Sequence, residues 1–155
     1  MTKHNIVKFN IRFNSGKDKA FAKVFVFDTQ ENMFKFYRLQ ESKWGLKEKG
    51  IGTNNDFMAM FQPFQIFKVN RDGTKKPKNW IGNFLFYKHG FGIGTVAHEC
   101  GHAAIHWHQI NSNYDGKKTI INSHDEEENM LYILGLLNYN FWKQYTKRQK
   151  EIEDM

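Results

Sequence analysis

The hydrophobic period of this 155-residue chain changes near Thr95, and this change constrains its fold more than any other feature. Over residues 7–13, apolar and polar residues alternate strictly, which is the pattern of a strand with one buried face. Beyond Thr95, apolar residues recur every three or four positions, which indicates helices. We therefore predict a single α+β domain over residues 1–155, with a strand-rich segment over 1–90 and a two-helix segment over 91–150.

The strand-rich segment is expected to form a mainly antiparallel sheet. A turn signal at 14–18 joins the first strand to an apolar run at 21–27, which predicts a hairpin. Pro63 interrupts a later apolar run and predicts an edge, a bulge or a break there. The remaining expectations are strands at 33–37 and 80–87, a loop at 42–56, a turn at 70–73, a basic loop at 75–78 and a glycine-containing connection at 89–94.

The two helices differ in how clearly their ends are marked. Thr95 is a plausible N-cap for a helix that runs to about residue 109, in which Gly101 would allow close packing. The second helix is expected to open with a capping box, Ser123 as N-cap and Glu126 at its third position. Residues 143–155 are rich in charge, and we expect them to fray.

Composition excludes several classes of protein. One cysteine rules out an internal disulfide and favours a reducing compartment, so we expect a cytoplasmic location. No run approaches the roughly 20 apolar residues of a membrane-spanning helix, and no membrane partner is expected. The formal net charge of +7 would suit an acidic protein partner or nucleic acid, although the lysines and arginines are scattered along the chain.

The most informative segment of the chain contains His98, Glu99 and His102. Residues four apart on a helix share one face, so the two imidazoles can direct ring nitrogens at one metal ion. Glu99 lies beside that face, close enough to act on a metal-bound water without being a ligand. This arrangement is typical of a helical zinc-protease site, and Zn2+ is the expected cofactor.

A catalytic zinc ion needs a third protein ligand and one open coordination position. His108 stands ten residues after His98, as in the longer metzincin motif, but Ile105 occupies the position where that motif needs a glycine. His106 lies a further helical turn away, too far to share one ion with both His98 and His102.

The acidic cluster at the start of the second helix offers a better third ligand. Glu127 precedes apolar residues by three, four and seven positions, so its side chain would turn toward the buried stripe, where a carboxylate needs a cation. We therefore predict Glu127 as the third ligand. Glu126 is the nearest alternative, and Glu128 and His124 also remain open. Without a metal, the same acids would simply favour the N-terminus of a helix.

The segment 95–104, together with Glu126-Glu127-Glu128-Asn129-Met130-Leu131, resembles the gluzincin metallopeptidases. It is most similar to the small ImmA/IrrE-type enzymes, over about residues 80–142. The resemblance implies a sheet packed on an active-site helix and a glutamate helix, with His98, His102 and Glu127 as metal ligands and Glu99 as catalytic base. The family usually has a small residue where Glu128 stands. The segment around His98 also resembles SprT-like proteases, but no matching histidine motif follows it.

These observations predict a zinc-dependent endopeptidase that acts on a protein or peptide substrate. Glu99 would take a proton from a zinc-bound water and return it to the leaving amine, with His124 or Tyr132 as candidate oxyanion donors. The strand at 80–87 could accept an extended substrate by strand addition. Cys100 is expected to be a buried, inert thiol. The alternative is a basic nucleic-acid- or protein-binding module with a structural metal or none.

Overall fold

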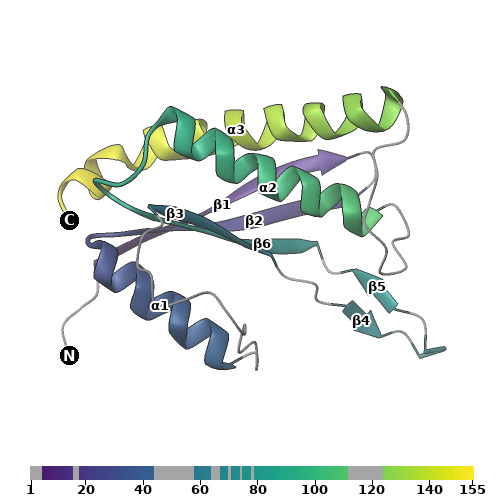
Figure 1. Cartoon of the computed structure of the whole chain (residues 1–155), viewed down its shortest axis with the longest axis horizontal. Coiled ribbons are helices and arrows are strands. Elements are labelled where there is room, and N and C mark those ends of the chain that lie inside the picture. Colours follow the sequence, from purple (N-terminus) through teal and green to yellow (C-terminus); the bar gives the residue numbers. More distant parts are fainter. Residues whose placement is uncertain are drawn as a thin grey trace.

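The computed structural model describes residues 5–15, 18–43, 58–63, 67–69, 71–73, 75–77, 79–111 and 124–155. Within these residues the chain forms a mixed sheet with helices on both of its faces (Figure 1). In chain order the elements are β1 (Ile6–Ser15), β2 (Asp18–Phe27), α1 (Gln30–Lys43), β3 (Ala59–Pro63), β4 (Phe67–Val69), β5 (Lys75–Pro77), β6 (Trp80–Tyr87), α2 (Ile93–Asn111) and α3 (His124–Glu153).

The α+β class is confirmed, but the sheet is mixed, whereas a mainly antiparallel one was expected. Its strand order is β1-β2-β6-β3, and β4 pairs with β5 in a separate two-stranded sheet. The predicted hairpin forms as the antiparallel pair β1 and β2. β2 and β6 run parallel, while β3 and β6 run antiparallel. The parallel pair arises because the chain leaves β2, forms α1 and β3, and then enters the sheet again in the same direction.

The strand predicted at 33–37 is wrong, because these residues lie in α1. The buried side chains of this segment are Met33, Phe34 and Tyr37, which have helical spacing. The helix begins after Thr29, whose Oγ1 accepts a hydrogen bond from the Asn32 N–H at 3.2 Å. Such an N-cap satisfies a backbone donor that the first helical turn leaves unpaired.

Two loop predictions also need correction. α1 continues to Lys43, so residues 42 and 43 of the loop predicted at 42–56 are helical, and the rest of that range lies outside the described part of the chain. The basic segment expected as a loop forms the short strand β5, which pairs with β4. Other predicted features lie partly outside the described ranges: Ser123 as a cap, residues 16 and 17 of the first turn, residue 70 of the turn at 70–73, and residue 78 of the basic loop.

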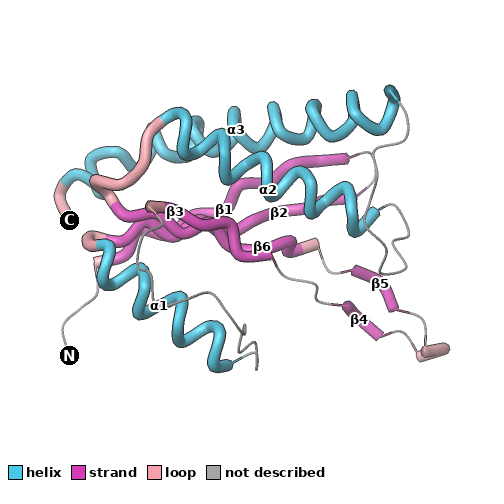
Figure 2. Tube along the Cα trace, in the orientation of Figure 1, coloured by secondary structure: helices cyan, strands magenta, loops and turns pink. Residues whose placement is uncertain are grey.

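The sheet separates two hydrophobic clusters, and helices cover each of them (Figure 2). On one face, Val7, Phe9, Ile11 and Phe13 of β1 point toward α2 and α3, which confirms the alternation read from the sequence. On the other face, β2 and β6 pack against α1. A sheet buried on both faces needs apolar side chains on both, which accounts for the near-continuous apolar sequence of β2 and β6.

Gly82 allows β3 to lie close to β6. It adopts φ +155°, and a Cβ atom at this position would lie 2.4 Å from the backbone oxygen of Gln62 and 2.8 Å from the ring of Phe61. Gly82 pairs with Pro63, the residue that ends β3. Of the alternatives predicted at Pro63, the edge is confirmed, because Pro63 is the last residue of β3, the edge strand beside β6.

α2 begins two residues before the predicted N-cap. The Val96 N–H donates to the Gly92 carbonyl at 3.0 Å, so Gly92 occupies the cap position and Thr95 lies inside the helix. The expected packing role of Gly101 is also wrong, because a Cβ atom there would meet nothing within 4 Å. Small size at Gly101 is therefore not a packing requirement.

α3 does not fray over 143–153, contrary to prediction, and it remains helical to Glu153. Ile152 is buried among the residues of the larger cluster, with 2% of its surface exposed. The Lys88 ammonium donates to the backbone oxygens of Glu153 and Met155. A cation on the terminal carbonyls of a helix stabilises that end, and the tertiary contact therefore keeps the last turns ordered. None of the helices in the described ranges has the length and hydropathy needed to cross a bilayer.

Candidate metal and catalytic site

His98 and His102 lie one helical turn apart on the exposed side of α2, and their Nε2 atoms lie close together. The two Nε2 atoms are 3.1 Å apart, and the rings are nearly perpendicular, with an interplanar angle of 81°. Two nitrogens bound at about 2.0–2.1 Å to one tetrahedral ion lie about 3.3 Å apart, so the pair fits two ligands of a single zinc ion. The same separation also suits an N–H···N hydrogen bond between the rings.

Glu99, the next residue along α2 after His98, directs its carboxylate to the backbone of β3. It is buried, with 7% of its surface exposed, and its Oε2 accepts a hydrogen bond from the Phe61 N–H at 2.6 Å. A buried carboxylate is costly unless it is hydrogen-bonded, and the backbone of β3 supplies that partner. The contact also determines the orientation of the carboxylate. A carboxylate can accept several hydrogen bonds, so this contact leaves it capacity for more.

A cavity of about 420 Å³ lies between α2 and β3. Its lining includes Glu99 and His102 from α2 and Met60 and Phe61 from β3. This volume falls within the range of small-molecule and peptide side-chain pockets. The cavity therefore brings a carboxylate and an imidazole to the same space beside a strand.

The structure does not bring the predicted third ligand to the histidine pair. α2 and α3 contact each other and run in roughly opposite directions, but they diverge toward the end where α3 begins, so the first turn of α3 lies away from the N-terminal half of α2, which carries His98 (Figure 1). Glu127 lies in that first turn, and its side chain is exposed. Within the described ranges, no three histidine, cysteine or acidic side chains gather closely enough to hold one metal ion. Glu127 therefore remains a prediction from the sequence.

The alternative ligands lie elsewhere. Glu128 and His124 are exposed, and the distance from His124 Nε2 to Glu128 Oε1 is 3.8 Å. Glu126 is half-buried. His108 is partly buried near the C-terminal end of α2, and its Nε2 has no hydrogen-bond partner among the residues that the structure describes. His106 lines the cavity beside β3, with its ring centroid 6.0 Å from that of Phe61.

The two oxyanion donors suggested by the sequence are not at the cavity. His124 and Tyr132 lie on α3, both are exposed, and neither lines the space beside Glu99.

Cys100 is fully buried, and burial, helped by the charge of Glu99, raises the pKa of its thiol to about 12. Both observations agree with an inert thiol at this position.

The edge strand next to the site is β3, and the sequence pointed to a different strand. β6 lies between β2 and β3, so strand addition at residues 80–87 is excluded within this sheet. Sequence reasoning missed β3 as a component of the site because a backbone N–H carries no sequence signal. Pro63 alone pointed to an edge, since proline is tolerated where no ladder hydrogen bond is required.

Comparison of the chain with known protein families, with curated proteins and with solved structures gave no match in any of the three.

Proposed function

We propose that the protein is a zinc-dependent peptidase whose site lies between α2 and the edge strand β3. The observation that carries the proposal is the pair of His98 and His102 Nε2 atoms 3.1 Å apart, with the buried Glu99 carboxylate on the next residue of the same helix. Two imidazoles alone could be a hydrogen-bonded surface pair. A buried carboxylate beside them, held by a backbone N–H and lining a cavity, favours catalysis over that reading.

His98 and His102 would hold the zinc ion, and the sequence favours Glu127 as the third ligand. When bound, zinc would lower the pKa of a water molecule to about 7 and polarise a peptide carbonyl. Glu99 would accept the proton of that water and deliver it to the leaving amine as the peptide bond breaks. The Phe61 N–H would hold the Glu99 carboxylate in place at the cavity that His102 also lines.

The substrate is expected to be an extended protein segment that lies along the free edge of β3. An edge strand offers unpaired backbone groups to a peptide, and β3 borders the same cavity as Glu99. The Phe61 N–H is already engaged by Glu99, and Pro63 has no N–H. Substrate pairing along β3 would therefore depend mainly on its backbone carbonyls.

The test combines metal content with cleavage of an unstructured, dye-labelled protein. We expect the purified chain to bind zinc in a ratio of one to one and to cleave the labelled protein. Glu99→Gln should keep the zinc and lose at least about a hundredfold in cleavage rate, because general base catalysis typically contributes that much. His98→Ala should lose both zinc and cleavage.

His106→Gln is the matched control, because His106 lies on the same helix and lines the same cavity but is not a predicted ligand. It should keep zinc at the wild-type ratio. Separate replacement of Glu126, Glu127 and Glu128 by glutamine then locates the third ligand, and we expect the loss at Glu127. Unchanged zinc binding in His98→Ala, or undiminished cleavage in Glu99→Gln, would refute the proposal.

A further inference from the structure

The free edge of β1 exposes backbone groups at the opposite side of the sheet from β3. Among the described strands β1 pairs only with β2, and the Arg12 carbonyl accepts a hydrogen bond from the Asn140 side chain at 2.7 Å instead of joining the ladder. In an antiparallel strand, alternate residues turn both backbone groups to the same side. The backbone N–H and C=O groups of Lys8 and Asn10 therefore also point away from β2. Within the described residues, no hydrogen bond reaches their outward backbone groups.

A groove along this edge carries three cationic side chains. It has a volume of about 500 Å³, and it is lined by Lys8, Phe9, Asn10 and Arg12 of β1 and by Asn140, Gln144 and Arg148 of α3. The described part of the chain contributes no carboxylate to this lining. In the described part of the chain, none of the three cations forms an ion pair. The groove is therefore positively charged and has amide groups along one wall.

Arg148 is held in place before any partner arrives. Its Nη1 donates to the backbone oxygen of Gln144 at 3.2 Å and to the side-chain oxygen of the same residue at 2.8 Å. The guanidinium also lies over the ring of Phe9, 5.2 Å from its centroid. A cation that is already oriented loses less conformational entropy when it binds an anion.

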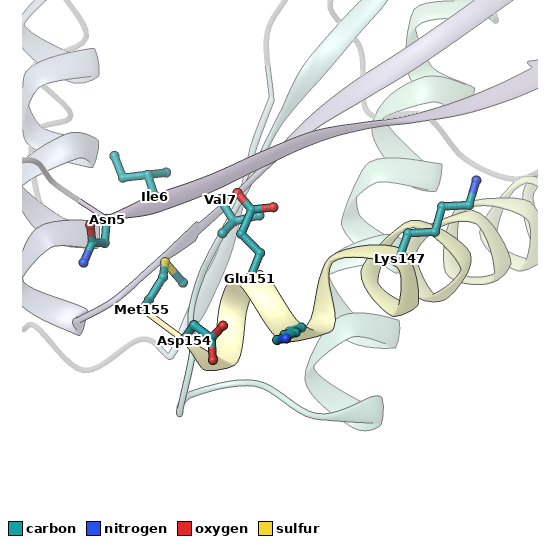
Figure 3. Close-up of a pocket in the computed structure, with 8 residues that line it drawn as sticks. Asn5, Ile6, Val7, Lys147, Glu151, Asp154 and Met155 are labelled. Carbon is teal, nitrogen blue, oxygen red and sulfur yellow. The ribbon is translucent and has the colours of Figure 1, made fainter.

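The cationic groove ends where a second cavity begins. This cavity, of about 690 Å³, lies between the start of β1 and the last turns of α3 (Figure 3). Glu151 and Asp154 line it together with Lys147 and Lys150, so its charge is mixed. Charge therefore attracts an acidic partner more strongly beside residues 8–12 than beyond them.

We propose that the β1 edge binds an acidic, extended segment of a partner protein as an added strand. Such a segment would satisfy the outward backbone groups of Lys8 and Asn10, and its carboxylates would pair with Lys8, Arg12 and Arg148. Phosphate groups only accept hydrogen bonds, so a nucleic-acid backbone would leave the two outward carbonyls unpaired. A second copy of this chain is disfavoured, because edge-to-edge pairing about Asn10 would place Lys8 opposite Arg12.

The inference does not depend on the proposed peptidase activity, and its test uses the purified chain with synthetic peptides. The probe is a short, capped, dye-labelled peptide of alternating threonine and glutamate, and binding is measured by fluorescence anisotropy at low salt. A matched peptide with glutamine in place of glutamate should bind at least about tenfold more weakly. Two further peptides carry methyl groups on alternate backbone nitrogens, one on the odd-numbered residues and one on the even-numbered residues. The peptide whose methylated nitrogens face β1 should not bind, and the other should bind normally.

Three variants of the protein complete the test. The double reversal Lys8→Glu with Arg12→Glu should weaken peptide binding at least about tenfold, whereas Arg71→Glu, an exposed charge reversal in the turn between β4 and β5, should leave binding unchanged. Asn10→Pro removes an outward N–H without removing a ladder hydrogen bond, and it should also weaken binding.

Three results would overturn the proposal. The first is an absence of peptide binding. The second is equal binding of the two methylated peptides, which would indicate simple charge attraction. The third is tighter binding of a single-stranded oligonucleotide that competes for the same groove. The methylated peptides are tested with the unmodified protein, so the comparison between them does not depend on the folding of any variant.

Discussion

At the residue scale, the burial of Cys100 predicts its chemical behaviour. Its thiol lies in the larger hydrophobic cluster next to Glu99, and burial raises its pKa to about 12. Because the thiolate is the reactive form, we expect the folded protein to react with an aromatic disulfide reagent at about pH 8 far more slowly than the protein in guanidinium chloride. The absorbance of the released thiol measures both rates. Equal rates would contradict the assigned burial.

Substitution by alanine should change the stability of the fold in opposite directions at two glycines. Gly101→Ala should raise the free energy of unfolding by about 0.5–1 kcal/mol, since its Cβ atom would meet nothing and alanine favours a helix. Gly82→Ala should lower it by about 2–4 kcal/mol, because its Cβ atom would collide with the backbone of β3. Chemical denaturation measures both values. A stabilising Gly82→Ala would show that β3 does not approach β6 closely.

At the scale of elements, the last turns of α3 depend on tertiary packing. Ile152→Ala should cost about 2–4 kcal/mol of unfolding free energy, because a buried isoleucine is lost near the end of the helix. Lys150→Ala, at an exposed position two residues earlier, should change stability by less than about 0.5 kcal/mol. Thermal unfolding of the two variants checks the difference. If the end of the helix frays, both substitutions will have the same small effect.

At the scale of the whole molecule, the sheet keeps the two proposed sites apart. β3 and β1 are its opposite edges, and both are bordered by the pair of helices that covers one face. α2 brings Glu99 to β3, whereas α3 brings Asn140 and Arg148 to β1. The two free edges of the sheet thus meet different chemistry, a carboxylate at one edge and cations at the other.

Periodicity alone determined the elements whose contacts are local or whose pattern is strict. The alternation over 7–13 identified β1 and its buried face, and the spacing of Met130, Ile133 and Leu137 identified α3. The motif of His98, Glu99 and His102 identified the candidate site, because residues on one helix keep their relative positions in any fold. Local signals were insufficient for α1, where the spacing of aromatic residues suited a strand and a helix alike.

Only the tertiary structure decided which strands lie at the edges and what each charged side chain meets. Strand order joins residues far apart in the chain, so no local pattern could show that β6 is internal or that Phe61 holds Glu99. The register of α3 against α2 likewise depends on packing between two helices. That packing, and not the spacing of the acidic residues, leaves Glu127 exposed and outside any three-ligand group in the described part of the chain.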